Sequence, residues 1–113
     1  MVDLKINDVL AHPLIARATA NNTRGLYCVQ IGALKTEILI MLMPSVKMPG
    51  WFDFKISHAI KTPLQTRAYR PRGTSSETRA YALRRAINSI VSHYQAAIDK
   101  GLRPGEDWLI WQK

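Results

Sequence analysis

The sequence predicts a single α+β domain spanning residues 1–113: a three-stranded, mainly antiparallel sheet, one long C-terminal helix packed on one face and a short N-terminal helical segment. Two patterns indicate this fold class. One long stretch near the C-terminus repeats apolar residues at intervals of three and four, as an amphipathic helix does. Three shorter stretches before it are continuously apolar or alternate with polar residues, as strands do. A chain of 113 residues can bury a core without a disulfide or a metal.

The long helix is expected over residues 74–100. Thr74 and Glu77 fit the capping-box pattern, in which each side chain bonds the backbone N–H of the other residue. Gly101 suits the left-handed position after a helix, and Pro104 prevents the helix from resuming. The apolar stripe that would face the sheet consists of Leu83, Ile87, Ile90, Tyr94 and Ile98.

Three strands are expected in the middle of the chain, over residues 26–33, 37–43 and 51–57. The last of them alternates most clearly, with Phe52 and Phe54 on one face. The middle stretch is almost continuously apolar, which favours a central strand covered on both faces, although periodicity alone does not distinguish it from a helix. Because short links join the three strands, we expect an antiparallel meander.

The two ends of the chain carry weaker signals. Residues 3–22 are interpreted as a weak helical start, and some of residues 3–12 could instead be extended. Residues 21–25 cluster the residue types that tolerate turn geometry, so the first element should end there. Residues 106–111 are expected to form a short strand or turn that returns Trp108 to the body of the domain.

Positive charge is concentrated in one part of the sequence. The net charge is +8, and residues 55–85 hold eight of the sixteen Lys and Arg residues but one of the eight acids. Clustering of this kind is typical of a protein that binds a polyanion. The alternative is a basic surface that contacts only solvent.

A nucleic-acid-binding surface is expected around the basic loop 61–73 and the start of the helix. Arginine offers planar, multidentate donors for phosphate, and an aromatic ring in such a loop can stack on an unpaired base. A helix N-terminus also favours an anion, although Glu77 opposes one there. The residues expected to contact nucleic acid are Lys55, Lys61, Arg67, Tyr69, Arg70, Arg72, Arg79, Arg84 and Arg85.

The predicted element order offers a resemblance of topology. Helix, three strands and helix resembles the order in double-stranded RNA-binding domains, whose last helix also begins at a Gly/Ser-rich turn. Residues 73–76 are loosely similar to that turn, whereas Ser76 and Glu77 stand where those domains have a lysine pair. Three strands followed by a helix is also similar to small DNA-binding modules of integrases. Both resemblances imply nucleic-acid binding, as an expectation from fold analogy alone.

The sequence offers little for catalysis or metal binding. Cys28 is the only cysteine and is expected to be a small buried residue, and the three histidines lie far apart, so we expect neither a metal site nor a cofactor. Asp53, Ser57 and His58 contain the residue types of a hydrolase, but Asp53 and His58 would point to opposite faces of a strand. We therefore expect a non-catalytic protein.

Location and rival functions follow from the same patterns. The N-terminus lacks a secretory pattern, and the most apolar run, 38–43, is far shorter than the roughly 20 residues that cross a bilayer, so a cytoplasmic protein with no membrane partner is expected. The first rival is a small protein-interaction module, an inhibitor, an adaptor or a homodimer, which docks on an acidic partner through Trp51, Trp108 and residues 38–43. A second rival is a small-ligand pocket lined by Trp and Tyr.

Overall fold

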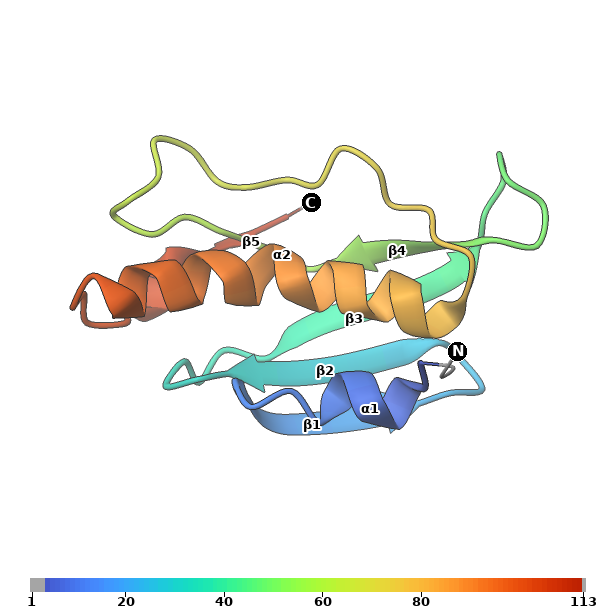
Figure 1. Cartoon of the computed structure of the whole chain (residues 1–113), viewed down its shortest axis with the longest axis horizontal. Coiled ribbons are helices and arrows are strands. Elements are labelled where there is room, and N and C mark those ends of the chain that lie inside the picture. Colours follow the sequence, from blue (N-terminus) through green and yellow to red (C-terminus); the bar gives the residue numbers. More distant parts are fainter. Residues whose placement is uncertain (1–3, 113) are drawn as a thin grey trace.

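The computed structural model describes residues 4–112 and places an antiparallel sheet in one layer and a long helix in the other (Figure 1). This α+β architecture, with its long C-terminal and short N-terminal helices, confirms the predicted fold class. The sheet, however, has four strands where the sequence pattern predicts three. In chain order the elements are α1 (Ile6–Leu10), β1 (Ile15–Asn21), β2 (Leu26–Ile31), β3 (Ile38–Pro44), β4 (Phe52–Ile56), β5 (His58–Ile60), α2 (Arg79–Asp99), the 3₁₀ turn η1 (Glu106–Trp108) and β6 (Leu109–Trp111).

The additional strand is β1, which occupies much of the range interpreted as a helical start. Of that range, residue 3 lies outside the described residues, only residues 6–10 are helical, and residues 15–21 pair with β2. All side chains of β1 after Ile15 are exposed, so this edge strand shows no alternation of apolar and polar residues. Its pairing with β2, from Ile15 opposite Ile31 to Asn21 opposite Leu26, makes it a strand. The strand order β1-β2-β3-β4 with antiparallel neighbours confirms the predicted meander.

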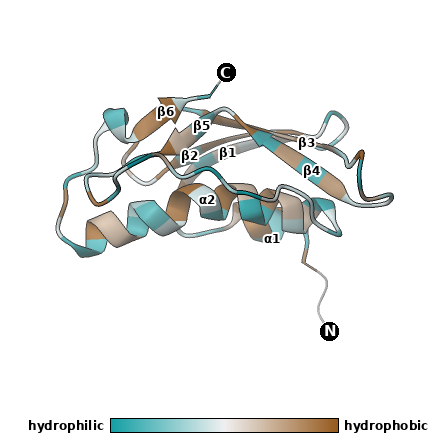
Figure 2. Cartoon of the chain, turned by 90° about the horizontal axis from the view of Figure 1, so that it is seen from above, coloured by the Kyte–Doolittle hydropathy of each residue, from teal (hydrophilic) through white to brown (hydrophobic). Residues whose placement is uncertain are grey.

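The core lies between the inner face of the sheet and α2. Along β2 and β3 every second residue is buried, and the inner face includes Tyr27, Val29 and Ile40. The alternation of hydrophilic and hydrophobic residues along α2 is visible in Figure 2. From the predicted stripe of this helix, the fully or almost fully buried residues are Leu83, Ile87, Ile90 and Tyr94.

The prediction that the middle strand is covered on both faces is wrong. On the outer face of β3, Leu39 is 42% exposed and Met41 is 40% exposed. Antiparallel sheets commonly leave one face in water, so the apolar residues of this outer face do not indicate a second buried layer. Cys28 also lies on this face and is half-buried, so it is not the core residue that the sequence suggests.

The long helix begins five residues later than the sequence pattern predicts. Thr78 is its N-cap, and the Thr78 hydroxyl accepts a hydrogen bond of 3.1 Å from the Tyr81 N–H. The Thr74–Glu77 capping box is therefore wrong, because Ser76 instead pairs with Phe52 at the start of β4 through two backbone hydrogen bonds of 2.8 Å. A strand-like contact at this point competes with the helical turn. The predicted end is close to the observed one, because α2 stops at Asp99.

A second, two-stranded sheet forms where β6 returns to β5. The chain bends at Ser57, between β4 and β5, and the sequence pattern includes no separate strand there. Trp108 is buried, as the predicted return of this segment to the body implies, so the expectation that it belongs to an exposed protein-interaction surface is wrong. Its ring lies edge-on to Tyr94 with the ring centroids 5.9 Å apart. η1 thus packs on the C-terminal half of α2, and β6 pairs with β5.

Candidate nucleic-acid interface

The chain between β5 and α2 runs along the open edge of β4 (Figure 1). It includes the basic residues 61–73, and we refer to all of residues 61–78 as the loop. Two short backbone contacts fix it. The Tyr69 N–H donates to the Ile60 carbonyl at 2.9 Å, and Ser76 exchanges two hydrogen bonds with Phe52. Between Leu64 and Gly73 the loop encloses a hollow of about 970 Å³ against α2. Backbone hydrogen bonds therefore hold the loop in place, and one side of it faces the hollow.

Four arginines line this hollow: Arg67, Arg70 and Arg72 from the loop, and Arg85 from α2. The described lining residues include no carboxylate. The hydrogen bonds of the arginines also go to neutral oxygens. Arg70 Nε donates to Gln112 Oε1 at 2.7 Å, and Arg85 donates to backbone carbonyls of the loop. These partners orient the guanidinium groups without neutralising their charge, so the hollow presents concentrated positive charge.

Arg85 has a structural part in the site as well. Its guanidinium donates to the carbonyl oxygen of Ser75 at 2.6 Å and to that of Gly73. One side chain of α2 thus donates to two carbonyls that lie two residues apart, which is the spacing of the carbonyls that a neighbouring strand would bind. Because residues 73–75 are anchored in this manner, the position of the loop depends on the helix.

The structure brings together five of the nine predicted contact residues. Tyr69 joins the four arginines of the hollow and is 42% exposed. The other predicted residues are exposed but lie outside this hollow: Lys55, Lys61, Arg79 and Arg84.

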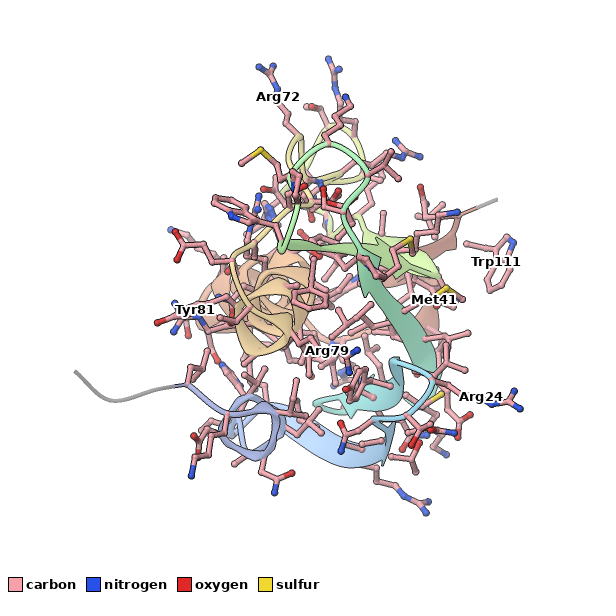
Figure 3. All side chains as sticks on the ribbon, turned by 90° about the vertical axis from the view of Figure 1, so that its right-hand side faces the viewer. Arg24, Met41, Arg72, Arg79, Tyr81 and Trp111 are labelled. Carbon is pink, nitrogen blue, oxygen red and sulfur yellow. The ribbon has the colours of Figure 1, made fainter. Side chains whose placement is uncertain are left out.

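The two other helix arginines have their own contacts. Arg79 Nη1 donates to the Asn22 carbonyl at 3.3 Å, and its guanidinium lies 5.3 Å from the centroid of the Phe52 ring. Figure 3 shows Arg79 near the middle of the molecule, whereas Arg72 projects from the loop. The Arg84 guanidinium lies 4.9 Å from the centroid of the Tyr81 ring. Adjacent positions on the helix thus point in different directions, which separates Arg84 from Arg85.

Sequence reasoning missed the polar residues that α2 contributes. The His93 ring lies 4.8 Å from the Tyr69 ring, centroid to centroid, with the planes tilted by 45°. Asn88, Ser92 and His93 line a smaller hollow of about 320 Å³ beside Tyr69 and Arg85. His93 is more than twenty positions from Tyr69 in sequence, so no local pattern connects the two. The spacing of Asn88 and Ser92 along one helical face was the only available signal.

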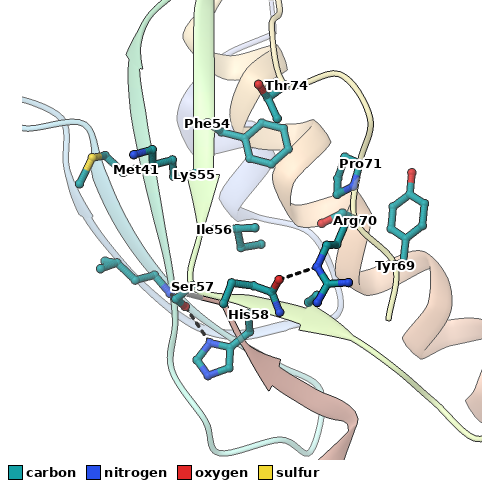
Figure 4. A pocket seen from close by; sticks show the side chains of 14 residues that line it. Met41, Phe54, Lys55, Ile56, Ser57, His58, Tyr69, Arg70, Pro71 and Thr74 are labelled. Atoms are coloured by element: carbon teal, nitrogen blue, oxygen red, sulfur yellow. Dashed lines mark hydrogen bonds between the residues drawn. The ribbon is translucent and has the colours of Figure 1, made fainter. Parts of the chain in front are cut away.

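A third hollow, of about 470 Å³, lies between β4 and the loop (Figure 4). Ser57 and His58 line it, and Ser57 Oγ lies 2.7 Å from His58 Nδ1. Ser57 Oγ also accepts a hydrogen bond of 2.8 Å from the Leu39 N–H, and the tautomer of the His58 ring decides which of Ser57 Oγ and His58 Nδ1 donates to the other. Burial lowers the pKa of His58, which favours the neutral ring. Asp53 accepts from Ser75 Oγ instead of orienting His58, so these residues do not form a catalytic triad.

The remaining expectations concern metals, membranes and a ligand pocket. Within residues 4–112 no group of three or more His, Cys, Asp or Glu side chains is placed to hold a metal ion. No helix in the described part of the chain has the length and apolar character to span a bilayer. Tyr69 lines all three hollows described above, and no tryptophan from the described residues lines any of them.

Comparison with known proteins found no matching family model, no matching curated protein and no matching solved structure. The observed element order also departs from the resemblance noted in the sequence. A fourth strand follows α1, and a 3₁₀ turn and a strand follow α2.

Proposed function

We propose that this protein binds nucleic acid without catalysing a reaction, and that residues 61–73 of the loop and α2 form the binding surface. The observation that carries the proposal is the hollow lined by Arg67, Arg70, Arg72 and Arg85, which has no carboxylate among its described lining residues. Phosphate oxygens accept hydrogen bonds and carry negative charge, which is the complement of such a surface.

The mode of binding follows from the residue types. Phosphate contacts position a nucleic acid without reading its sequence, so binding is weakly sequence-specific and steeply dependent on salt. Tyr69 lines the hollow and is 42% exposed, so we expect its ring to stack on a base. Lys55, Lys61, Arg79 and Arg84 lie outside the hollow and add long-range attraction.

Fluorescence anisotropy with labelled single- and double-stranded DNA and RNA, run over a range of salt concentrations, tests this proposal. Arg67→Ala and Arg72→Ala are the informative variants, because neither guanidinium has a hydrogen-bond partner in the described residues. Arg24→Ala removes the same charge from the exposed turn between β1 and β2 and is the matched control. For duplex DNA we expect the salt slope to fall by about 0.9 for each phosphate that an informative variant no longer binds, and to stay unchanged in the control.

Two outcomes would overturn the proposal. One is no binding of any of the four nucleic acids at low salt. The other is binding that Arg67→Ala and Arg72→Ala weaken no more than Arg24→Ala does, which would mean that only the net charge matters.

A second candidate function is docking on an acidic protein, or self-association into a homodimer. The observation that favours it is the apolar outer surface, where Leu39 and Met41 are about two-fifths exposed and Trp111 is 65% exposed. Aromatic and other large apolar residues are enriched where proteins bind one another. Light scattering separates the two forms of this candidate, because a homodimer that Met41→Glu dissociates supports self-association and a monomer at all concentrations excludes it.

A further inference from the structure

Two extended segments of the chain run side by side but pair only at their ends. Phe52 pairs with Ser76 at one end, and Ile60 pairs with Tyr69 at the other, both in antiparallel orientation. The first segment has eight residue steps between these contacts and the second has seven, so the two segments have nearly the same length. Residues 69–76 therefore border the whole open edge of β4 without forming a continuous ladder with it.

The space between the paired ends is the hollow of about 470 Å³. Figure 4 shows β4 on one side of it, with Phe54 and Ile56, and the loop on the other, with Arg70, Pro71 and Thr74. The Arg70 side chain bonds Gln112 Oε1 across one end, and the Phe52–Ser76 pair closes the other end. We refer to this space as the β4 slot.

The backbone of β4 offers unpaired hydrogen-bonding groups to the slot. Phe52 exchanges its bonds with Ser76, so its N–H and C=O point away from β3. Successive residues of a strand alternate in this respect, and the β3–β4 register is uninterrupted from Ile40 opposite Ile56 to Pro44 opposite Phe52. The N–H and C=O groups of Phe54 and Ile56 therefore also point into the slot. No backbone atom of residues 69–76 bonds them.

Contacts within the fold hold the slot open. Arg85 binds the carbonyls of Gly73 and Ser75 on the side of the loop segment that faces away from β4. The segment is thus anchored to α2 and to the C-terminal tail, and this keeps it from closing on β4.

We infer that the β4 slot binds an extended, acidic peptide of a partner protein, which adds a strand to β4 and pairs with Phe54 and Ile56. Two alternating N–H donors and two C=O acceptors are the complement of a peptide backbone, as in other cases of strand addition to a sheet edge. A phosphate chain offers acceptors only and would face the two carbonyls unfavourably. The slot is therefore a second binding site, which shares Tyr69, Arg70 and Pro71 with the hollow that we propose for nucleic acid.

The side chains around the slot define the chemistry of the peptide. Lys55 and Arg70 are the charged residues of the described lining, which has no carboxylate, so acidic side chains are favoured. Met41 is paired with Lys55 and so lies on the same outer face of the sheet, whereas Phe54 and Ile56 supply apolar contacts on the inner face. Since side chains of a strand alternate between two faces, a sequence that alternates Asp or Glu with Val or Ile fits both kinds of contact.

Selection from a displayed library of random heptapeptides on the intact protein tests this inference. We expect binders enriched in Asp and Glu and in β-branched residues. A synthetic copy of one binder, N-methylated at each position in turn, should lose binding by about tenfold or more at every second position, because only alternate amides face β4. A library that gives no binder, or losses without this alternation, would overturn the inference.

Two protein variants and an internal reference sharpen the test. Ile56→Pro removes one N–H that faces the slot and none that faces β3, whereas the control Ile56→Val keeps it, so only the former should lose peptide binding. In hydrogen exchange, the Phe54 and Ile56 amides should exchange faster than those of Asp53 and Lys55 in the free protein and become protected when peptide binds. Equal protection in the free protein would mean that the loop itself closes the slot, and the inference would fail.

Discussion

The Nη1 atom of Arg85 lies 2.6 Å from the carbonyl oxygen of Ser75, ten residues earlier in the chain. Its guanidinium also bonds the Gly73 carbonyl. A side chain that the sequence pattern predicts to contact nucleic acid is therefore also an anchor for the loop that carries Arg67, Arg70 and Arg72.

Replacement of Arg85 should destabilise the fold more than replacement of its neighbour. Arg85→Ala removes charge-assisted hydrogen bonds to two carbonyls, and we expect the free energy of unfolding to fall by about 1 to 2 kcal/mol. Arg84→Ala removes the same charge and one exposed contact with Tyr81, so its cost should stay below about 1 kcal/mol. Urea unfolding measures both, and equal costs would show that Arg85 does not anchor the loop.

The position of the helix start is testable with two threonines. Thr78→Ala removes the hydroxyl that caps α2 and should cost about 1 kcal/mol. Thr74→Ala lies before the helix and should cost less than about 0.5 kcal/mol. Thermal unfolding of both variants checks this, and the reverse order would place the cap where the sequence pattern suggests it.

Gly32 should tolerate no side chain. Its φ is +55°, and an added Cβ would stand 2.1 Å from Tyr94 Oη, which accepts a hydrogen bond of 3.0 Å from the Ala33 N–H. Gly32→Ala combines backbone strain with displacement of Tyr94, and we expect a loss of about 2 to 4 kcal/mol.

Gly101→Ala is the matched control for this change, because Gly101 also has a positive φ, of +80°, but nothing lies within 4 Å of an added Cβ. Backbone strain alone should cost about 1 to 2 kcal/mol there. Equal losses in chemical unfolding would show that the contact with Tyr94 contributes nothing.

Glu106 should make stability depend on pH in the acidic range. Its carboxylate accepts from the Thr36 hydroxyl at 2.6 Å and from the backbone N–H groups of Lys35 and Thr36 at 2.9 Å each. The Thr36 hydroxyl bond is the main cause that lowers the pKa of Glu106. A lowered pKa stabilises the fold fully above the unfolded value of about 4.3, and this contribution is lost as the pH falls through the folded value.

Urea unfolding at pH 6 and at pH 3 measures this effect. The native protein should exceed Glu106→Gln in stability at pH 6, and the difference should shrink at pH 3. Thr36→Val removes one of the donors and should reproduce part of the change. A difference that stays constant between the two pH values would contradict the assignment.

Much of the fold followed from local patterns. The stripe that includes Leu83 and Tyr94 predicted α2, because a helix with one apolar face must bury it. Alternation predicted β2 and β4, and Gly101 marked the end of the helix. The exposed side chains of β1 gave no alternation, so pairing with β2, a contact between distant residues, determined that strand.

The sequence by itself determined that this protein is basic, that its positive charge gathers in residues 55–85 and that a long helix covers a sheet. Composition and periodicity are local properties, and they fix charge and amphipathic faces. The tertiary structure alone decided which arginines meet in one hollow, that His93 reaches Tyr69, and that β4 keeps an open edge. These relationships join segments far apart in the chain, and only the packing of α2 on the sheet fixes their distances.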